Sequence, residues 1–300
     1  MSVFSLRNGK LFAENVALSQ IGQRFGTPCF VYSRVALEQA FRRYDQAFGT
    51  RPHLICYAMK ANSNLAILDL FARLGSGFDI VSGGELARVI AAGGDPGKTV
   101  FSGVGKTRDD MRQALAAGVM CFNVESESEL ERLNDVAQEM NRQAPVSIRV
   151  NPDIDAKTHP HISTGRKENK FGVAFGEALR IYRKAHALRN LKVVGIDCHI
   201  GSQLTELAPF VDALRKVLEL VDALAAEGIE LKHLDLGGGL GIRYRDEMPP
   251  PPDMYVKALL DCVGERRQEI LLEPGRSLVG NAGLLLTRVE YQPLTWSQPA

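Results

Sequence analysis

The stretch from residue 53 to residue 62, HLICYAMKAN, decides how the rest of the chain is interpreted. Its apolar run is typical of a buried strand. The run ends at Lys60, and a lysine is rarely buried without a partner or a chemical role. We therefore ask whether other apolar runs of the chain also end in polar residues, because strand ends that share one edge can form a site.

Eight apolar runs occur between residue 53 and about residue 280, and amphipathic stretches separate them. In TRDDMRQALAAG (107–118), for example, apolar residues recur at spacings of three and four, which predicts a helix. Eight alternations of strand and helix predict an α/β fold with a closed (β/α)8 barrel of the TIM type, and a doubly wound open sheet is the competing arrangement. The runs are HLICYAMK, GFDIVSG, KTVFSGV, CFNVES, PVSIRVNP, KVVGIDCHIGS, LKHLDLGGG and EILLEPG.

Composition narrows the range of partners and compartments. The 300 residues are 45% hydrophobic, with 36 basic against 35 acidic residues and a formal net charge of +1. This balance predicts no nucleic-acid partner and no membrane partner, and no apolar stretch reaches the ~18 residues of a spanning helix. The five cysteines are scattered without a CxxC pair, and the first residues lack the apolar core of a secretory signal. We expect a cytoplasmic protein with reduced thiols.

The ends of the predicted strands carry polar and glycine residues that an ordinary buried strand would not select. In a barrel these ends meet at one rim, where active sites form. Singly, each residue has an ordinary explanation: Lys60 could extend into solvent, Asp79 and Glu85 could favour helix N-termini, and His199 could be a hydrogen-bonded core residue. Their joint occurrence favours a site. The candidate residues are Lys60, Asp79, Glu85, His199, Ser202, Gly237, Gly238, Gly239, Glu273, Gly275 and Arg276.

The chemistry of these residue types matches the parts of pyridoxal phosphate. The glycine run 237–239, Ser202 and Arg276 predict a phosphate site, and the run is no dinucleotide fingerprint because position 242 is Ile. A lysine in an apolar pocket has a lowered pKa and attacks carbonyl groups. An imidazole can stack on a flat ring, and a carboxylate can keep a pyridine nitrogen protonated. We therefore expect this cofactor, with a lysine as its attachment point.

Five motifs resemble those of the alanine-racemase-like class of pyridoxal phosphate enzymes, in its decarboxylase branch. The motifs are YAMKAN (57–62), FDIVSGGE (78–85), HIGSQ (199–203), DLGGGLGI (235–242) and EPGRSLVGNAG (273–283). In addition, HISTGRKENKFG (161–172) is similar to the corresponding segment of the diaminopimelate decarboxylase family. The similarity runs from about residue 8 to residue 291. It implies decarboxylation of meso-2,6-diaminopimelate to L-lysine, the last step of lysine biosynthesis; ornithine and arginine decarboxylases are the nearest competing members.

The resemblance implies three catalytic residues. Lys60 would bind the cofactor covalently, His199 would stack on its ring, and Glu273 would bond the ring nitrogen. Asp79 and Glu85 correspond to acids that the family places near the histidine and the attachment point. No metal site is expected.

The resemblance also implies how the phosphate and the substrate are held. Arg276 would contact both the phosphate and a substrate carboxylate. The other residues implied near the phosphate are Ser202, Gly237, Gly238, Gly239 and Gly275.

A division of the chain into three parts follows from the same resemblance. Residues 1–30 would belong to a second, β-rich domain, residues 31–283 would form the cofactor-binding barrel, and residues 284–300 would begin the C-terminal part of the β-domain. No cysteine here is followed by x-x-Gly-Asp, the motif that the family's β-domain supplies. We expect a chain in which that domain is largely missing. The strands CFVYS (29–33) and LLLTRVEY (284–291) would then lack sheet partners.

Two other functions remain open from the sequence. One is a non-catalytic barrel that binds pyridoxal phosphate, and the other is an aldolase in which Lys60 attacks the substrate directly. The expected partners are a small amino-acid substrate and a second copy of the chain, since the family precedent is a homodimer.

Overall fold

Eight parallel strands form a closed barrel in the computed structural model, which describes residues 3–154 and 171–291. Neighbours around the barrel follow the order β9, β11, β12, β13, β5, β6, β7 and β8, and β8 pairs in turn with β9. This closure confirms the predicted (β/α)8 barrel and excludes an open sheet. The strands are β5 (His53–Ala58), β6 (Gly77–Ile80), β7 (Thr99–Phe101), β8 (Cys121–Val124), β9 (Ala144–Asn151), β11 (Leu191–Asp197), β12 (His233–Asp235) and β13 (Glu269–Leu272), with the short β10 (Val173–Ala174) beside β9.

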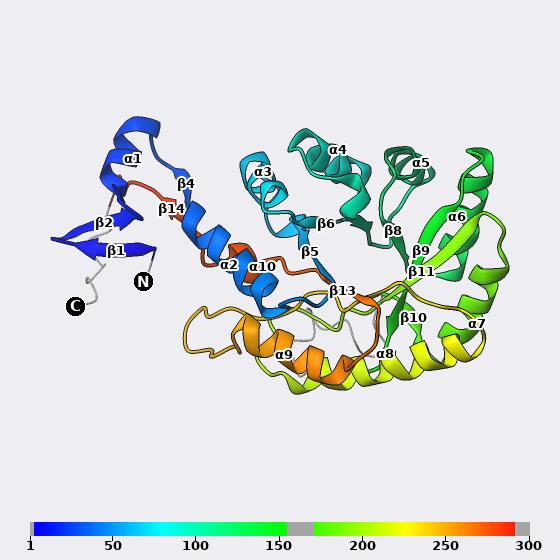
Figure 1. The fold of residues 1–300 in the computed structure, drawn as a ribbon. Coiled ribbons are helices and arrows are strands. Elements are labelled where there is room, and N and C mark those ends of the chain that lie inside the picture. The colour runs from blue at the N-terminus through cyan, green and yellow to red at the C-terminus, as the bar shows by residue number, and fades with distance from the viewer. Residues whose placement is uncertain (1–2, 155–170, 292–300) are drawn as a thin grey trace.

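Helices cover the outside of the barrel (Figure 1). Local sequence sets their ends: α5 begins with a capping box between Thr107 and Asp110 and ends at Gly118, whose φ of 75° is left-handed. In the described parts of the chain, no helix combines the length and apolar character needed to cross a membrane. The helices are α2 (Arg34–Ala47), α3 (Leu65–Arg73), α4 (Gly83–Ala91), α5 (Arg108–Ala117), α6 (Glu127–Glu139), α7 (Phe175–Ala187), α8 (Ala208–Ala226) and α9 (Pro252–Val263).

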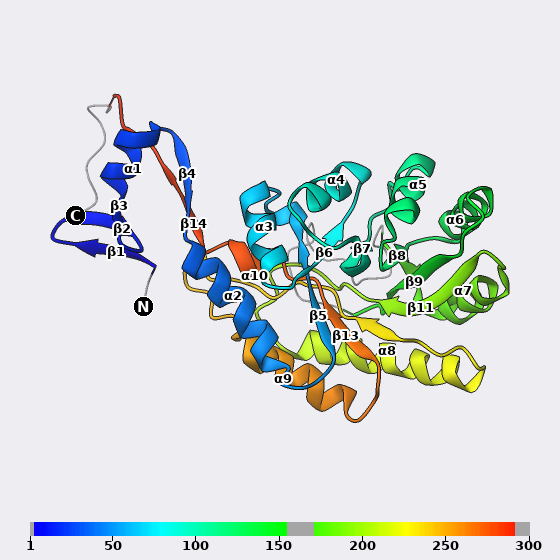
Figure 2. The same cartoon turned by 45° about the horizontal axis from the view of Figure 1, so that its top comes forward.

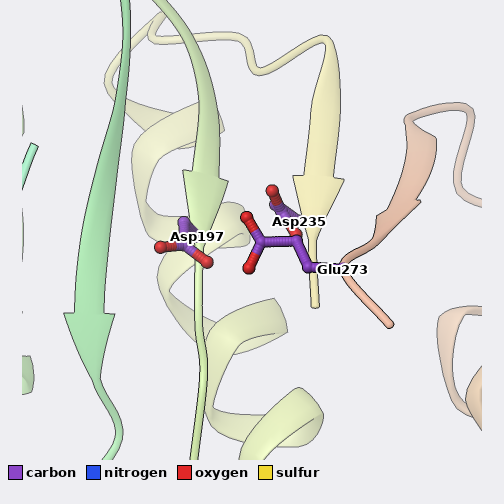
Figure 3. A group of neighbouring side chains, drawn as sticks. All are labelled: Asp197, Asp235 and Glu273. Atoms are coloured by element: carbon purple, nitrogen blue, oxygen red, sulfur yellow. The ribbon is translucent and has the colours of Figure 1, made fainter. Parts of the chain in front are cut away.

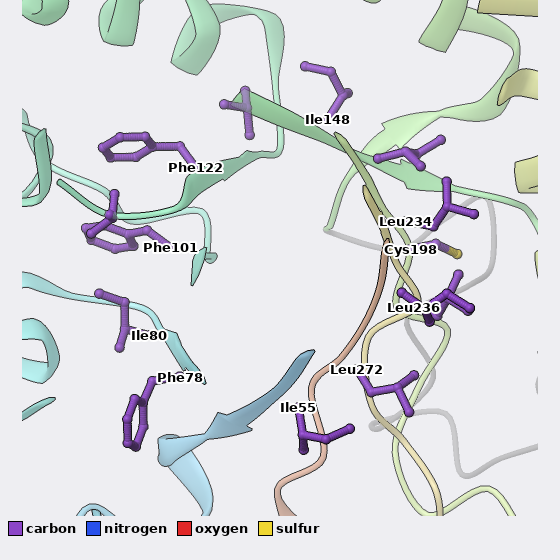
Figure 4. Packing of buried hydrophobic residues seen from close by; sticks show 14 of the residues in the cluster. Ile55, Phe78, Ile80, Phe101, Phe122, Ile148, Cys198, Leu234, Leu236 and Leu272 are labelled. Carbon is purple, nitrogen blue, oxygen red and sulfur yellow. The ribbon is translucent and has the colours of Figure 1, made fainter. Parts of the chain in front are cut away.

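The alternation of side chains along the strands separates two apolar layers. Outward-facing residues such as Phe78, Phe122 and Leu272 lie on the outer side of the ring of strands and pack beneath the helices (Figure 4). Residues one position away face the opposite side of the sheet. Several of these form a small apolar cluster of their own: Cys56, Val100, Cys121, Val194 and Leu271.

Beyond this apolar cluster, toward the C-terminal ends of several strands, polar residues lie close to the C-terminal rim. On β8 the order is Cys121, Phe122 and Asn123, so the asparagine shares a face with the cysteine. A charged residue also lies near the C-terminal end of four further strands; on β13 it follows Leu271 of the apolar cluster by two residues, and on β11 the register shifts between Val193 and Gly195. These residues are Arg149 on β9, Asp197 on β11, Asp235 on β12 and Glu273 just after β13. The pattern that buries the core thus also builds a polar layer at one rim.

The first and last described segments meet beside the barrel. A small antiparallel sheet of β1 (Phe4–Arg7), β2 (Lys10–Ala13) and β3 (Val16–Ala17) leads through α1 (Leu18–Phe25) to β4 (Cys29–Tyr32). β4 pairs antiparallel with β14 (Gly283–Leu286), and the two lie side by side in Figure 2.

The expectation that these two strands lack sheet partners is therefore wrong, because each is the partner of the other. The chain enters and leaves the barrel at one place, where the Ser33 N–H donates to the Ala282 carbonyl at 2.7 Å. Of LLLTRVEY, only residues up to Leu286 form strand. The division at residues 30 and 283 stays a prediction.

Lys106 is a fully buried cation that holds the loop after β7. Its Nζ donates to the Gly103 carbonyl (2.6 Å), the Asn123 carbonyl (2.8 Å) and Glu129 Oε1 (2.7 Å). We expect Lys106→Met to lower the free energy of unfolding by roughly 3–5 kcal/mol, because Glu129 would lose its cation partner in a largely buried place. Urea unfolding followed by circular dichroism measures this loss.

The matched control is Lys257→Met, since Lys257 is 74% exposed and pairs with Asp261 on the surface of α9. Its loss should stay below about 0.5 kcal/mol. Equal losses in the two variants would show that the Lys106 contacts add nothing to stability.

Candidate active site

A cavity of about 430 Å³ opens at the rim formed by the C-terminal strand ends. It brings together most of the residues that the sequence singled out, although they come from four separate segments of the chain. The candidate residues that line it are Lys60, His199, Ser202, Gly239, Glu273, Gly275 and Arg276. The rim position confirms that the polar strand ends converge on one place.

Lys60 lies in the single turn η1 (Met59–Ala61) directly after β5 and forms an ion pair with the neighbouring strand. Its Nζ is 2.8 Å from Asp79 Oδ2, and the Asp79 side chain is fully buried. Glu85 instead contacts the backbone just before its own helix: Glu85 Oε2 accepts a hydrogen bond from the Val81 N–H at 2.7 Å, and Ser82 is the N-cap. Burial, and to a smaller extent the charge of Asp79, raises the pKa of Glu85.

The expected lowering of the Lys60 pKa is wrong for the protein without cofactor. Burial does act against the ammonium charge, but the negative charges of Asp79 and Glu273 outweigh it and raise the pKa of Lys60. Lys60 is therefore a charged amine that must give up a proton before it can attack a carbonyl carbon. Asp79 Oδ2 lies within hydrogen-bond distance of that proton.

His199 is a neutral imidazole held against the glycine run. The Gly238 N–H donates to its Nδ1 at 3.2 Å, so Nδ1 is unprotonated and the ring proton is on Nε2. Burial, together with the positive charges of Arg149 and Lys60, lowers the pKa of His199 well below its ordinary value. The ring is thus neutral and fixed, which suits stacking on a flat ligand.

The triple glycine mainly connects the ends of neighbouring strands, and only one of its residues faces the cavity. The Gly237 N–H donates to Asp235 Oδ1 at 3.0 Å, and the Gly238 N–H is used by His199. Of the three glycines only Gly239 lines the cavity, with a φ of 117°. A side chain on Gly239 would collide with the Gly201 carbonyl oxygen, so only glycine keeps the backbone open at this point.

Glu273 belongs to a buried cluster of three carboxyl groups that lie on neighbouring strands. Asp197, Asp235 and Glu273 each place an oxygen within 4.8 Å of the others, and the side chains point toward one another in Figure 3. Ser102 Oγ and Asn123 Nδ2 both lie 3.4 Å from Glu273 Oε1.

Burial and mutual repulsion raise the pKa values of this cluster. Burial and then Asp235 raise the pKa of Glu273 well above its ordinary value, and burial raises the pKa of Asp235 to about 6. Lys60 and Arg149 supply the nearby positive charge, and Arg149 Nε is 3.8 Å from Asp197 Oδ2. Without a further cation, the cluster therefore holds at least one of its carboxyl groups in the neutral form.

Sequence reasoning assigned no role to Asp197, Asp235, Asn123 or Arg149. The sequence did carry a signal for these residues, because each is a polar residue near the C-terminal end of an otherwise apolar strand. Residues 161–170 of the motif HISTGRKENKFG lie outside the described residues. Its last residue, Gly172, donates its N–H to Glu125 Oε2 at 3.2 Å, and Glu125 Oε1 is 3.1 Å from Arg149 Nη1.

The residues at the cavity fit pyridoxal phosphate. Among the described lining residues, Lys60 has the only primary amine. Glu273 is a buried carboxyl group with no ion pair to any described residue, which suits a positively charged ring nitrogen. Ser202 and Arg276 supply donors for an anion near the open backbone of Gly239.

The backbone of Glu273 lies very close to Gly238, so a substitution at Gly238 tests whether this close packing shapes the cavity. A Cβ at Gly238 would collide with the Glu273 carbonyl oxygen, and Gly237 accepts the Glu273 N–H at 2.7 Å in the same place. We expect Gly238→Ala to shift Glu273 and the cavity wall, with a loss of about 1–3 kcal/mol in unfolding free energy and weaker binding of pyridoxal phosphate. Urea unfolding and absorbance titration with the cofactor measure the two effects.

Gly105→Ala is the control, because nothing lies within 4 Å of the added Cβ. That variant should bind the cofactor as the unchanged protein does. A Gly238→Ala protein with unaltered stability and cofactor affinity would contradict the packing argument.

Comparison with known proteins agrees with this geometry. The family model described as "Pyridoxal-dependent decarboxylase, pyridoxal binding domain" matches residues 34–280. The barrel and its rim cavity are thus those of a pyridoxal phosphate-dependent decarboxylase.

Three relatives identify the branch. Diaminopimelate decarboxylase of Pseudomonas aeruginosa is 62% identical over 291 residues, which cover 97% of this chain and 70% of that protein. The enzyme of Vibrio cholerae is 60% identical, covering 95% and 68%. The crystal structure of the Helicobacter pylori enzyme complexed with L-lysine is 45% identical, with a TM-score of 0.87, covering 89% and 68%. This chain belongs to the diaminopimelate decarboxylase family.

Proposed function

We propose that this chain decarboxylates meso-2,6-diaminopimelate to L-lysine and carbon dioxide with pyridoxal phosphate bound in the rim cavity. The observation that carries the proposal is the meeting of Lys60, Glu273 and Arg276 at one cavity, in a chain 62% identical to a diaminopimelate decarboxylase. The L-lysine in the Helicobacter pylori structure supports lysine as the product.

Lys60, His199 and Glu273 would hold the reactive part of the cofactor. Lys60 would bind its aldehyde carbon, the neutral His199 ring would cover one face of the pyridine ring, and Glu273 would meet the ring nitrogen. Asp79 and Glu85 would set the charge around Lys60. The residues proposed near the phosphate are Ser202, Gly237, Gly238, Gly239, Gly275 and Arg276. When bound, pyridoxal phosphate supplies an electron sink for the negative charge that remains when carbon dioxide leaves.

The protein's own groups manage protons and orientation. Asp79 Oδ2, at 2.8 Å, would accept the proton that Lys60 Nζ must release before it attacks a carbonyl carbon. Glu273, as a carboxylate, would hold a proton on the ring nitrogen. Arg276 would bind a substrate carboxylate through its planar pair of N–H groups and so fix which bond is broken.

Incubation of the purified chain with pyridoxal phosphate and meso-diaminopimelate tests the proposal. We expect L-lysine and carbon dioxide in equal amounts. Visible absorbance of the bound cofactor without lysine would favour the non-catalytic barrel instead. Release of carbon dioxide from ornithine or arginine, but not from diaminopimelate, would move the chain to the other decarboxylases. Lysine formation without added or bound cofactor would overturn the role of pyridoxal phosphate.

We further propose a cytoplasmic homodimer. The family precedent supports the dimer. The five cysteines, all free, with Cys56, Cys121 and Cys198 buried, support a reducing compartment. Light scattering during size-exclusion chromatography measures the molecular mass, and a value near the 32.9 kDa of one chain would contradict the dimer.

A further inference from the structure

The loop after the triple glycine is held in a fixed shape. Gln203, next to Ser202 in the HIGSQ motif, clamps it from one side: Gln203 Nε2 donates to the Ile242 carbonyl at 2.6 Å, and the Ile242 N–H donates to Gln203 Oε1 at 3.1 Å. Gln203 itself has a φ of 59°, a left-handed conformation that a residue with a side chain rarely adopts. This unusual conformation coincides with both contacts to the loop.

A second clamp lies on the other side of the loop. Glu247 Oε2 accepts hydrogen bonds from the N–H groups of Tyr244, at 3.0 Å, and Arg245, at 2.7 Å. The backbone at Tyr244 is therefore anchored, although the residue is 60% exposed. Core packing therefore does not hold the Tyr244 side chain, and its position depends on the anchored backbone and on its contacts at the surface.

That contact is with Arg276. Arg276 Nη1 donates to the Tyr244 hydroxyl oxygen at 2.7 Å, and the guanidinium carbon lies 5.7 Å from the centre of the Tyr244 ring. Both side chains line the cavity. Within residues 3–154 and 171–291, no carboxylate forms an ion pair with Arg276, and its remaining N–H groups can serve an added anion.

We propose that Tyr244 is a positioning residue that orients the Arg276 guanidinium toward an oxyanion at the open side of the cavity. This proposal rests on the proposed function. The oxyanion is either the phosphate of the cofactor or a carboxylate of the substrate, since both accept paired N–H groups of arginine. The hydroxyl fixes one nitrogen of the guanidinium, and the ring beside it limits rotation of the long side chain, so less freedom is lost when the anion binds.

Tyr244→Phe tests the hydroxyl while it keeps the ring. If the anion is the phosphate, we expect the dissociation constant of pyridoxal phosphate to rise by roughly tenfold, as measured by absorbance titration. If the anion is the carboxylate, KM for meso-diaminopimelate should rise by a similar factor while kcat and cofactor affinity stay unchanged. Tyr291→Phe is the matched control, because that residue is 92% exposed and does not line the cavity.

A second variant separates positioning from direct binding. Tyr244 acts through Arg276 in this proposal, so in an Arg276→Lys background Tyr244→Phe should have almost no further effect. Additive effects would mean that Tyr244 binds the anion itself and would overturn the proposal. So would a Tyr244→Phe protein whose cofactor affinity and KM both equal those of the Tyr291→Phe control.

These measurements also distinguish a failure of the proposed function from a failure of the role proposed for Tyr244. If the unchanged chain does not bind pyridoxal phosphate, the proposed function fails, and the role of Tyr244 fails with it. If the unchanged chain binds the cofactor and Tyr244→Phe alters nothing, only the role of Tyr244 fails. Unaltered urea unfolding of Tyr244→Phe, expected for an exposed side chain, shows that its folding is intact.

Discussion

Replacement of Lys60 by alanine abolishes the absorbance band near ~420 nm that belongs to pyridoxal phosphate linked covalently to a lysine, and lowers lysine formation by roughly 10³-fold or more, the scale of losing a covalent catalytic group. The reason is that no other described lining residue of the cavity has a primary amine. A cofactor that stays bound through its phosphate alone would lack the covalent link. Absorbance spectra of the reconstituted protein and a lysine assay measure the two losses.

Lys60→Arg is the companion variant, because the loss of Lys60 also leaves Asp79 buried without its ion pair. Arginine keeps a positive charge next to Asp79 but stays protonated and cannot attack the aldehyde. We expect Lys60→Arg to fold and to lack the absorbance. An alanine or arginine variant that keeps the absorbance would show that a different amine holds the cofactor.

Much of the fold could be predicted from the sequence because strand and helix leave different apolar periods. Each of the eight apolar runs contains one barrel strand, and the polar residues at their ends meet at one rim. Strand pairing between distant segments leaves no such period, so the antiparallel contact of β4 with β14 was not foreseen. The pairing depends on where the chain enters and leaves the barrel.

The part of the site that the sequence did not predict depends on neighbours across the barrel. The pKa of Lys60 depends on Asp79, which lies on the adjacent strand, and on Glu273. Likewise, the apolar run HLDL does not show that Asp235 faces Glu273 and Asp197. Residue types at strand ends identify the cofactor, whereas the charge state of each group requires the three-dimensional arrangement.

Glu273→Gln should lower kcat by roughly 10²–10³-fold while binding of the cofactor weakens little. Burial, followed by the charges of Asp235, Asp79 and Asp197, raises the pKa of Glu273, and the positive charge of Lys60 acts in the opposite direction. A positive ring nitrogen would allow Glu273 to ionise despite its burial. The neutral amide of Gln cannot balance that charge, so the ring would lose its proton and withdraw electrons less strongly. Steady-state kinetics and absorbance titration separate kcat from affinity.

Glu269→Gln is the control on the same strand, since Glu269 begins β13 at the opposite end of the barrel. It should leave kcat unchanged.

The pH dependence of the unfolding free energy of the cofactor-free protein is a second measurement of the Glu273 role. Because the folded-state pKa of Glu273 is raised, the folded protein binds this proton more tightly than the unfolded chain does. Its contribution to stability is therefore complete below the unfolded pKa and is lost as the pH rises toward the folded value. Glu273→Gln should make that decline shallower, and Glu269→Gln should not. Equal kcat values for the two variants, or equal slopes of unfolding free energy against pH, would remove Glu273 from the role proposed for it.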